Sequence, residues 1–315
     1  FFPTSMRTCS ARIKKTNIRS VMTHLGEQEN IPRAAAWLVL GVSGGLGLDL
    51  CAKQILQTYP LVQFVLLRSG IAMLIMLAVA PRFGGYEALR SKEIGWHFLR
   101  TLFAIGAMYG FFYGLAHMPL VNALTLGYTA PLIMTVLASI FLDETIGWRR
   151  WAAVSVGFAG VLMILRPGSG EFSIAAAAVL IAAFCYACQA ITARRLSATE
   201  STLALSFYVV VGPLVVALAI IDTNTWLSPD LAGWVLFCAA AVASIIAWFG
   251  FVNGYRAVSP ATLAPVEYIA LVGGAIAGFL IWDEVPDRWV VMGAMIIISS
   301  GVFVVYRSEA RKAEV

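Results

Sequence analysis

The chain has 315 residues, of which 60% are hydrophobic and only 12% are charged. An ordinary soluble domain is about 45–50% apolar and about 25% charged, so the composition excludes a soluble enzyme, a nucleic-acid-binding protein and a disordered chain. It indicates a polytopic membrane protein. The long continuous apolar blocks favour spanning helices over a transmembrane barrel, whose strands alternate polar and apolar residues.

Ten apolar blocks follow one another along the chain, each near the roughly 20 residues that a spanning helix needs. They lie at about 34–52, 61–80, 97–116, 120–142, 148–166, 173–193, 203–221, 232–255, 261–282 and 289–306. Their connections are short, and no soluble domain fits between them. We therefore predict an all-α fold of ten transmembrane helices, in which many small residues allow close helix packing.

The basic residues predict the orientation of these spans. If both ends of the chain are cytoplasmic, 18 of the 22 Lys and Arg lie on the cytoplasmic side and three, Lys53, Arg166 and Arg288, lie outside. This bias predicts an inner-membrane protein with cytoplasmic N- and C-termini. The basic segment 1–33 is expected to be a cytoplasmic tail. Residues 1–26, which contain no Asp or Glu, also resemble a transit peptide in composition, and Met22 is an alternative natural start.

The chain repeats itself weakly at an offset of about 140 residues. The matches pair Ala116-His117-Met118-Pro119 with Ala257-Val258-Ser259-Pro260, Tyr128 with Tyr268, Asp143-Glu144 with Asp283-Glu284, and Gly160-Val161 with Gly301-Val302. Residues 34–166 and 173–306 then form two five-helix repeats, followed by a C-terminal tail, 307–315. Because five is odd, the second repeat is inverted. Inverted repeats are typical of secondary transporters that bind substrate near the midplane.

These residues also carry a family resemblance. The stretch from Pro119 through Thr129-Ala130-Pro131-Leu132 to Asp143-Glu144 resembles the EamA-type half of the drug/metabolite transporter superfamily. So does Leu263-Ala264-Pro265-Val266-Glu267-Tyr268 with the Asp-Glu and Gly-Val pairs that follow, and Phe64…Arg68 is similar to the family's second span. The resemblance covers about residues 34–307. It implies ten helices as two inverted halves around a central cavity, and transport of small metabolites, often amino acids and often as export.

Three ionisable residues lie inside predicted spans, where an unpaired charge is costly. Glu267 follows Pro265 by two positions and is a candidate for binding a cationic group or a coupled proton; alternatively, it bonds a neighbouring helix. Asp49 and Arg68 are candidates for the two charges of a zwitterionic substrate. The structural alternative is a local pair of Asp49 with Lys53, at helical i,i+4 spacing, or with Arg68.

Aromatic residues add candidate substrate contacts, since aromatic faces attract ammonium groups. Tyr128 and Tyr268 are the preferred candidates because they match across the repeat. The others are Tyr109, Tyr186 and Trp248. The alternative for each is a place in the core or against lipid. Pro131 and Pro265, in the fourth and ninth spans, are the expected hinge or kink points.

Other motifs are missing from the sequence. No nucleotide-binding loop, Ser–His pair or His–Glu metal constellation is indicated, so we expect no enzyme activity, no cofactor and no metal, and we assign Cys185 and Cys188 to packing. The expected function is secondary transport of a small polar or zwitterionic metabolite of the amino-acid or amine class, driven by protons or exchange. The alternatives are a facilitator or exporter of a carboxylate, vitamin or nucleoside-like cofactor, and a lipid-handling protein.

Overall fold

The computed structural model describes residues 33, 35–83, 85–91, 93–141, 147–166, 173–196, 200–257 and 268–313, and all regular elements in these ranges are helical. The α-helices are Ala35–Leu56, called here the first helix, α2 (Leu61–Val79), α3 (Ile94–His117), α4 (Leu120–Gly127), α5 (Ala130–Phe141), α6 (Trp148–Leu165), α7 (Ile174–Leu196), α8 (Thr202–Ile220), α9 (Leu231–Ala257), α11 (Ile269–Trp282) and α12 (Arg288–Ala313). Short 3-10 helices follow α2 (Ala80–Phe83, and η2 at Tyr86–Leu89) and α8 (Thr223–Thr225).

Most of these helices have the length and apolar composition of membrane-spanning helices. Among the described residues, seven helical segments are long and apolar enough to cross one, the α4–α5 segment Leu120–Leu137 being counted once. Three shorter apolar helices, in α6, α11 and α12, lie in the remaining predicted blocks. The polytopic all-α class is thus confirmed, while the count of ten spans remains a prediction.

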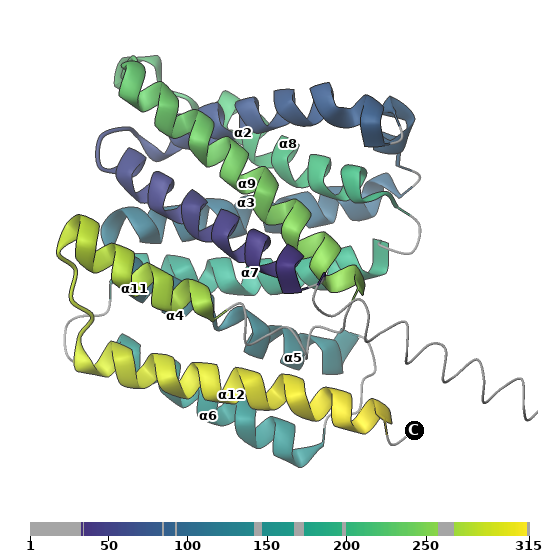
Figure 1. Ribbon diagram of the computed structural model, residues 1–315, viewed down its shortest axis with the longest axis vertical. Helices are drawn as coiled ribbons and strands as arrows, with labels where there is room; N and C mark the ends of the chain where they lie inside the picture. Colours follow the sequence, from purple (N-terminus) through teal and green to yellow (C-terminus); the bar gives the residue numbers. More distant parts are fainter. Residues whose placement is uncertain are drawn as a thin grey trace, which may run out of the picture.

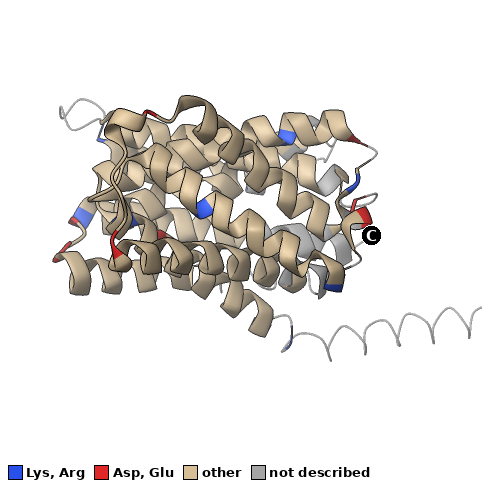
Figure 2. Cartoon of the chain, turned by 90° about the horizontal axis from the view of Figure 1, so that it is seen from above, with Lys and Arg blue, Asp and Glu red and all other residues tan. Residues whose placement is uncertain are grey.

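The helices lie side by side with their long axes roughly aligned (Figure 1). α6 and α12 pair at one edge, and the first helix crosses α9. Lys, Arg, Asp and Glu gather mainly at the two helix ends and leave the middle largely uncharged (Figure 2). α3 and α8 begin at one end, called here the α3-start end. The first helix, α3 and α11 finish at the other, called the opposite end.

Glycines bring segments far apart in sequence into backbone contact. A Cβ atom on Gly44 of the first helix would lie 2.7 Å from the backbone nitrogen of Ala247 in α9. A Cβ atom on Gly110 of α3 would lie 2.7 Å from the carbonyl oxygen of Ala178 in α7. Each contact joins a helix before residue 166 to one after residue 173. Small residues therefore provide the close packing that membrane helices need.

The predicted fourth span is interrupted. α4 ends at Gly127, Tyr128 and Thr129 form a turn, and α5 resumes at Ala130. Pro131 explains the position, because it has no N–H for the carbonyl of Gly127 and its ring crowds that carbonyl. The kink expected at Pro131 is thus a break about three residues before it. The break exposes backbone groups near the middle of a span, which is tolerated where the segment lines a buried or polar site.

Candidate substrate site

Arg68 is a buried cation with weak partners. It lies in α2, and its side chain is 4% exposed. Its Nη2 lies 3.3 Å from Ser69 Oγ and 3.4 Å from Met108 Sδ, and its guanidinium lies 5.8 Å from the centre of the Phe112 ring. Its Nε has no hydrogen-bond partner among the described residues. A guanidinium carries five N–H donors, so most of its capacity is unused here.

Asp49 is the acid that acts on Arg68. It lies half-buried in the first helix and interacts electrostatically with Arg68, but the two side chains form no direct ion pair within 4 Å. The structure therefore places two opposite charges near each other, and among the described residues neither forms an ion pair. The direct Asp49–Arg68 pair that the sequence allowed is not formed.

The local ion pair of Asp49 with Lys53 does not form either, because Lys53 pairs with Glu284 instead. Its Nζ forms an ion pair with Glu284, donates to the carbonyl oxygen of Met118 at 3.1 Å and lies 5.3 Å from the centre of the Trp282 ring. The other Glu284 oxygen accepts from the N–H of Leu120 at 2.8 Å. This ion pair ties the first helix to the end of α11 and to the α3–α4 connection at the opposite end.

We expect Glu284→Gln to lower the thermal unfolding midpoint of the purified protein by several degrees. The substitution leaves the Lys53 ammonium, whose side chain is 8% exposed, without its counter-charge, and removing one partner of a buried pair is strongly destabilising. Asp287→Asn is the matched control, because its pair with Arg166 is more exposed, and exposed pairs contribute little. Equal midpoint changes in the two variants would contradict this prediction.

Tyr128 and Tyr268, matched across the repeat, come together in the fold. Their ring centres lie 5.4 Å apart with an interplanar angle of 42°. Tyr128 lies in the break of the fourth span, and Tyr268 directly precedes α11 with its hydroxyl against Gly301 of α12. The interrupted helix and the start of α11 thus present two aromatic faces to one another.

Aromatic rings continue from this pair toward Arg68. A Cβ atom on Gly127, the neighbour of Tyr128, would lie 3.4 Å from the Phe111 ring, and the ring centres of Phe111 and Phe112 are 5.5 Å apart. Phe112 in turn lies under the Arg68 guanidinium. Charged and aromatic candidates from the first helix, α2, α3, the α4–α5 break and α11 therefore belong to one connected region, called here the Arg68–Tyr128 region.

The remaining candidates lie in different surroundings. Tyr109 donates from its hydroxyl to the carbonyl oxygen of Pro213 at 3.3 Å and so links α3 to α8. Tyr186 lies on an exposed face of α7, with 46% of its surface accessible, and Trp248 is half-buried in α9. Glu267 and Pro265 lie outside the described residues, so their roles stay predictions.

A buried polar cluster at the α3-start end escaped the sequence analysis. His97 Nε2 lies 3.7 Å from Glu200 Oε2. Ser91 donates to the other Glu200 oxygen at 2.7 Å, and Arg100 Nη1 donates to the carbonyl oxygen of Leu205 at 2.6 Å. No spacing signals this cluster, because its members come from segments about a hundred residues apart.

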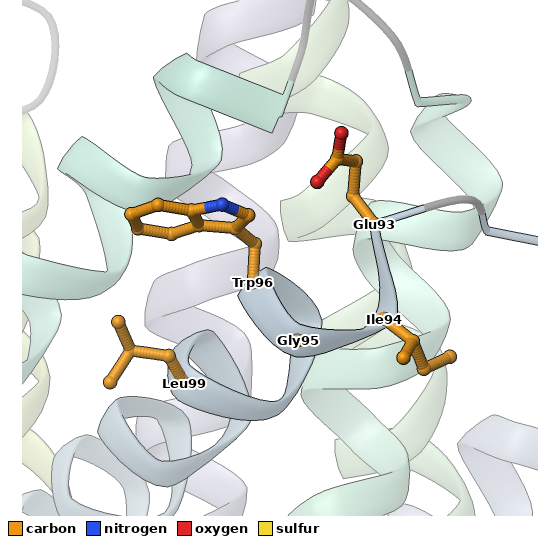
Figure 3. A pocket seen from close by; sticks show the side chains of 5 residues that line it. All are labelled: Glu93, Ile94, Gly95, Trp96 and Leu99. Carbon is orange, nitrogen blue, oxygen red and sulfur yellow. The ribbon is translucent and has the colours of Figure 1, made fainter.

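A surface pocket of about 310 Å³ lies beside this cluster, at the beginning of α3. It is lined by Glu93, Ile94, Gly95, Trp96 and Leu99 (Figure 3). Met108, which contacts Arg68, is roughly 20 Å further along the same helix, at 1.5 Å per residue. The pocket therefore belongs to the end of the protein and is separate from the Arg68–Tyr128 region.

Known proteins resemble almost the whole chain. The model of the EamA-like transporter family matches residues 34–166 and 173–307. The S-adenosylmethionine uptake transporter of Rickettsia bellii is 28% identical over 86% of this chain and 92% of its own length. The riboflavin transporter of Vibrio cholerae and the pseudopaline exporter of Pseudomonas aeruginosa are each 28% identical over 78% of this chain, and over 83% and 86% of their own lengths.

A solved crystal structure shares the fold. It superposes with a TM-score of 0.62 and covers 89% of this chain and 99% of its own, at 19% sequence identity. At that identity the likeness concerns the arrangement of helices alone.

Proposed function

Because the chain belongs to the EamA-like transporter family, we propose that it moves a small zwitterionic metabolite across the inner membrane by alternating access, as a secondary active transporter. A membrane-embedded metabolite transporter, and not an enzyme, follows from the family and from the names of the relatives. We propose, in addition, the substrate class, the coupling to protons or exchange, and the cytoplasmic position of both termini. The observation that carries the substrate class is the buried, weakly partnered guanidinium of Arg68.

A buried cation within a bilayer is expensive unless it is paired or faces a polar site. A hydroxyl and a thioether supply little compensation for Arg68, because neither carries a charge. A carboxylate can accept two parallel hydrogen bonds from one guanidinium, which is the strongest arrangement open to this side chain. The substrate group best suited to Arg68 is therefore a carboxylate.

A positive group on the same substrate could pair with Asp49, the acid near Arg68. Asp49 is close enough to act on Arg68 electrostatically, so one small zwitterion can place its ammonium near Asp49 and its carboxylate at Arg68. Glu267 is a second candidate for the cationic group. The Tyr128–Tyr268 pair offers aromatic faces to an ammonium, a sulfonium or a flat ring.

S-adenosylmethionine combines these features, since it carries a carboxylate, an ammonium, a sulfonium and an adenine ring. One relative is named as its uptake transporter, so this compound is the first substrate to test. The second candidate class is a vitamin or nucleoside-like compound. The neighbouring rings of Tyr128 and Tyr268 favour it, and one relative is named as a riboflavin transporter, but such a compound would leave Arg68 without a carboxylate.

The test is binding and flux with the purified protein. We expect S-adenosylmethionine, or failing that another amino-acid zwitterion, to raise the thermal unfolding midpoint and to enter proteoliposomes by counterflow, because a ligand of the folded state stabilises it. Methionine supplies the zwitterion without the ring, adenosine the ring without the zwitterion, and riboflavin the alternative class. Binding and transport of riboflavin or adenosine, with no effect of any zwitterion, would overturn the proposed substrate class.

A further inference from the structure

The cluster around His97 holds an imidazole in an unusual setting. His97 is 1% exposed, and neither ring nitrogen has a hydrogen-bond partner among the described residues. Its ring lies 4.3 Å from that of Tyr208 in α8, measured between ring centres. The imidazole therefore packs against the Tyr208 ring between α3 and α8.

Two described groups of opposite charge act on His97. Glu200 supplies one negative charge after α7, and Arg100, which is 3% exposed and also acts on His97 electrostatically, supplies one positive charge. Two tyrosines among the described residues also face these groups, Tyr208 of α8 on the imidazole and Tyr186 of α7 on Arg100, and Glu93 lies one helical turn before His97. A proton on His97 would place a second positive charge beside the buried Arg100. Glu200 attracts that proton, but it lies 3.7 Å away and already accepts from Ser91.

Hydrogen bonds beside His97 join α3 to α8, and α8 to the segment before α3. Arg100 and Thr101 of α3 donate to the carbonyl oxygens of Leu205 and Tyr208 in α8, and the Tyr208 hydroxyl donates to the carbonyl oxygen of Leu89. α3 lies in the first family match and α8 in the second. Opening the α3-start end between the two parts of the chain would separate these contacts and bring His97 into water.

The opposite end is held by the Lys53–Glu284 ion pair and by a contact whose groups do not titrate. Gln63, which is 1% exposed at the start of α2, donates to the carbonyl oxygen of Leu227 at 2.5 Å and accepts from its N–H at 3.1 Å. This contact links α2 to the α8–α9 connection without an ionisable group.

We propose that His97 is a proton-binding site that opens the α3-start end of the protein when it becomes charged. Water stabilises the imidazolium, whereas the closed cluster buries it beside Arg100, so protonation favours the state in which this end is open. Histidine changes its charge between about pH 5 and 8, the range in which a proton gradient acts. The inference rests on the proposed alternating access, and in the predicted orientation the proton comes from the cytoplasm.

The experiment is hydrogen–deuterium exchange of the purified protein at pH 5.5 and 8.0 without substrate, corrected for the chemical exchange rate. We expect peptides covering 86–101 and 200–209 to be roughly fivefold less protected at the acidic pH. His97→Gln should abolish this difference. Glu200→Gln should enlarge it, because the carboxylate that attracts the proton is lost. His117→Gln is the matched control, since His117 is exposed at the far end of the same helix.

Equal or greater protection at pH 5.5, or a difference that survives in His97→Gln, would overturn the proposal. Because no substrate is present, either result leaves the transport assay to decide the proposed function separately. Conversely, a pH-dependent opening with no transported zwitterion would uphold the proton site and refute the substrate class. Misfolding of a variant would appear as loss of protection throughout the helices.

Discussion

Replacing Arg68 by lysine is expected to lower the flux of a carboxylate-bearing substrate about ten- to a hundredfold while the protein stays folded. Lysine keeps the charge but loses the planar pair of donors and the stacking on Phe112. One lost charge-assisted hydrogen bond, about 1.5–3 kcal/mol, accounts for a change of this size. Arg68→Gln removes the charge as well and should abolish transport.

The measurement is counterflow into proteoliposomes, with substrate binding followed by thermal shift in the same preparations. Arg82→Lys is the matched control, because Arg82 is exposed just beyond the same helix. We expect that control to transport at the wild-type rate. Wild-type flux in Arg68→Lys and Arg68→Gln, with S-adenosylmethionine or another zwitterion as substrate, would show that Arg68 does not hold the carboxylate.

Adding one methyl group at Gly44 is expected to destabilise the protein by about 1–3 kcal/mol or more, the usual cost of overpacking. The Cβ atom of Gly44→Ala would lie 2.7 Å from the backbone nitrogen of Ala247 and 2.9 Å from the carbonyl oxygen of Ala243. Backbone atoms in a helix cannot rotate away as a side chain can. The first helix and α9 must therefore separate, which also loosens the contacts above and below.

Gly45→Ala provides the control at the next position of the same helix. Its Cβ atom would meet only the Phe251 ring, at an ordinary 3.9 Å, so its stability should stay close to that of the wild type. Thermal unfolding of both variants in the same detergent, followed by size-exclusion chromatography, measures the difference. Two equally stable variants would show that the first helix and α9 do not pack at Gly44.

The sequence predicted best where a signal is local or repeated. A charge within an apolar block is visible without a structure, so Asp49 and Arg68 could be singled out as candidates. Tyr128 and Tyr268 could be paired because the internal repeat matches them, and the structure places their rings together. Whether Arg68 already has a counter-ion depends on packing in three dimensions, and its weak partners could be recognised only there.

Contacts between residues far apart in the sequence could not be predicted from local spacing. The i,i+4 spacing favoured Asp49 as the partner of Lys53, but Glu284 competes successfully from the end of α11. His97 and Glu200 meet because α3 and the α7–α8 connection lie at one end, which no pattern in either segment indicates. The fourth span reads as continuous because its residues are apolar throughout, whereas the backbone breaks where Pro131 removes a hydrogen bond.

The ion pair between Lys53 and Glu284 cannot form until most of the chain has been synthesised. The two residues are 231 positions apart, so at about 5–20 residues per second the ribosome needs roughly ten to fifty seconds to supply the second partner. During that interval the newly inserted first helix holds a lysine near its C-terminal end whose native counter-ion is still unmade. Close packing against α9 through Gly44 must wait almost as long. The first helix thus reaches these native contacts only after most of the chain that follows it has been made.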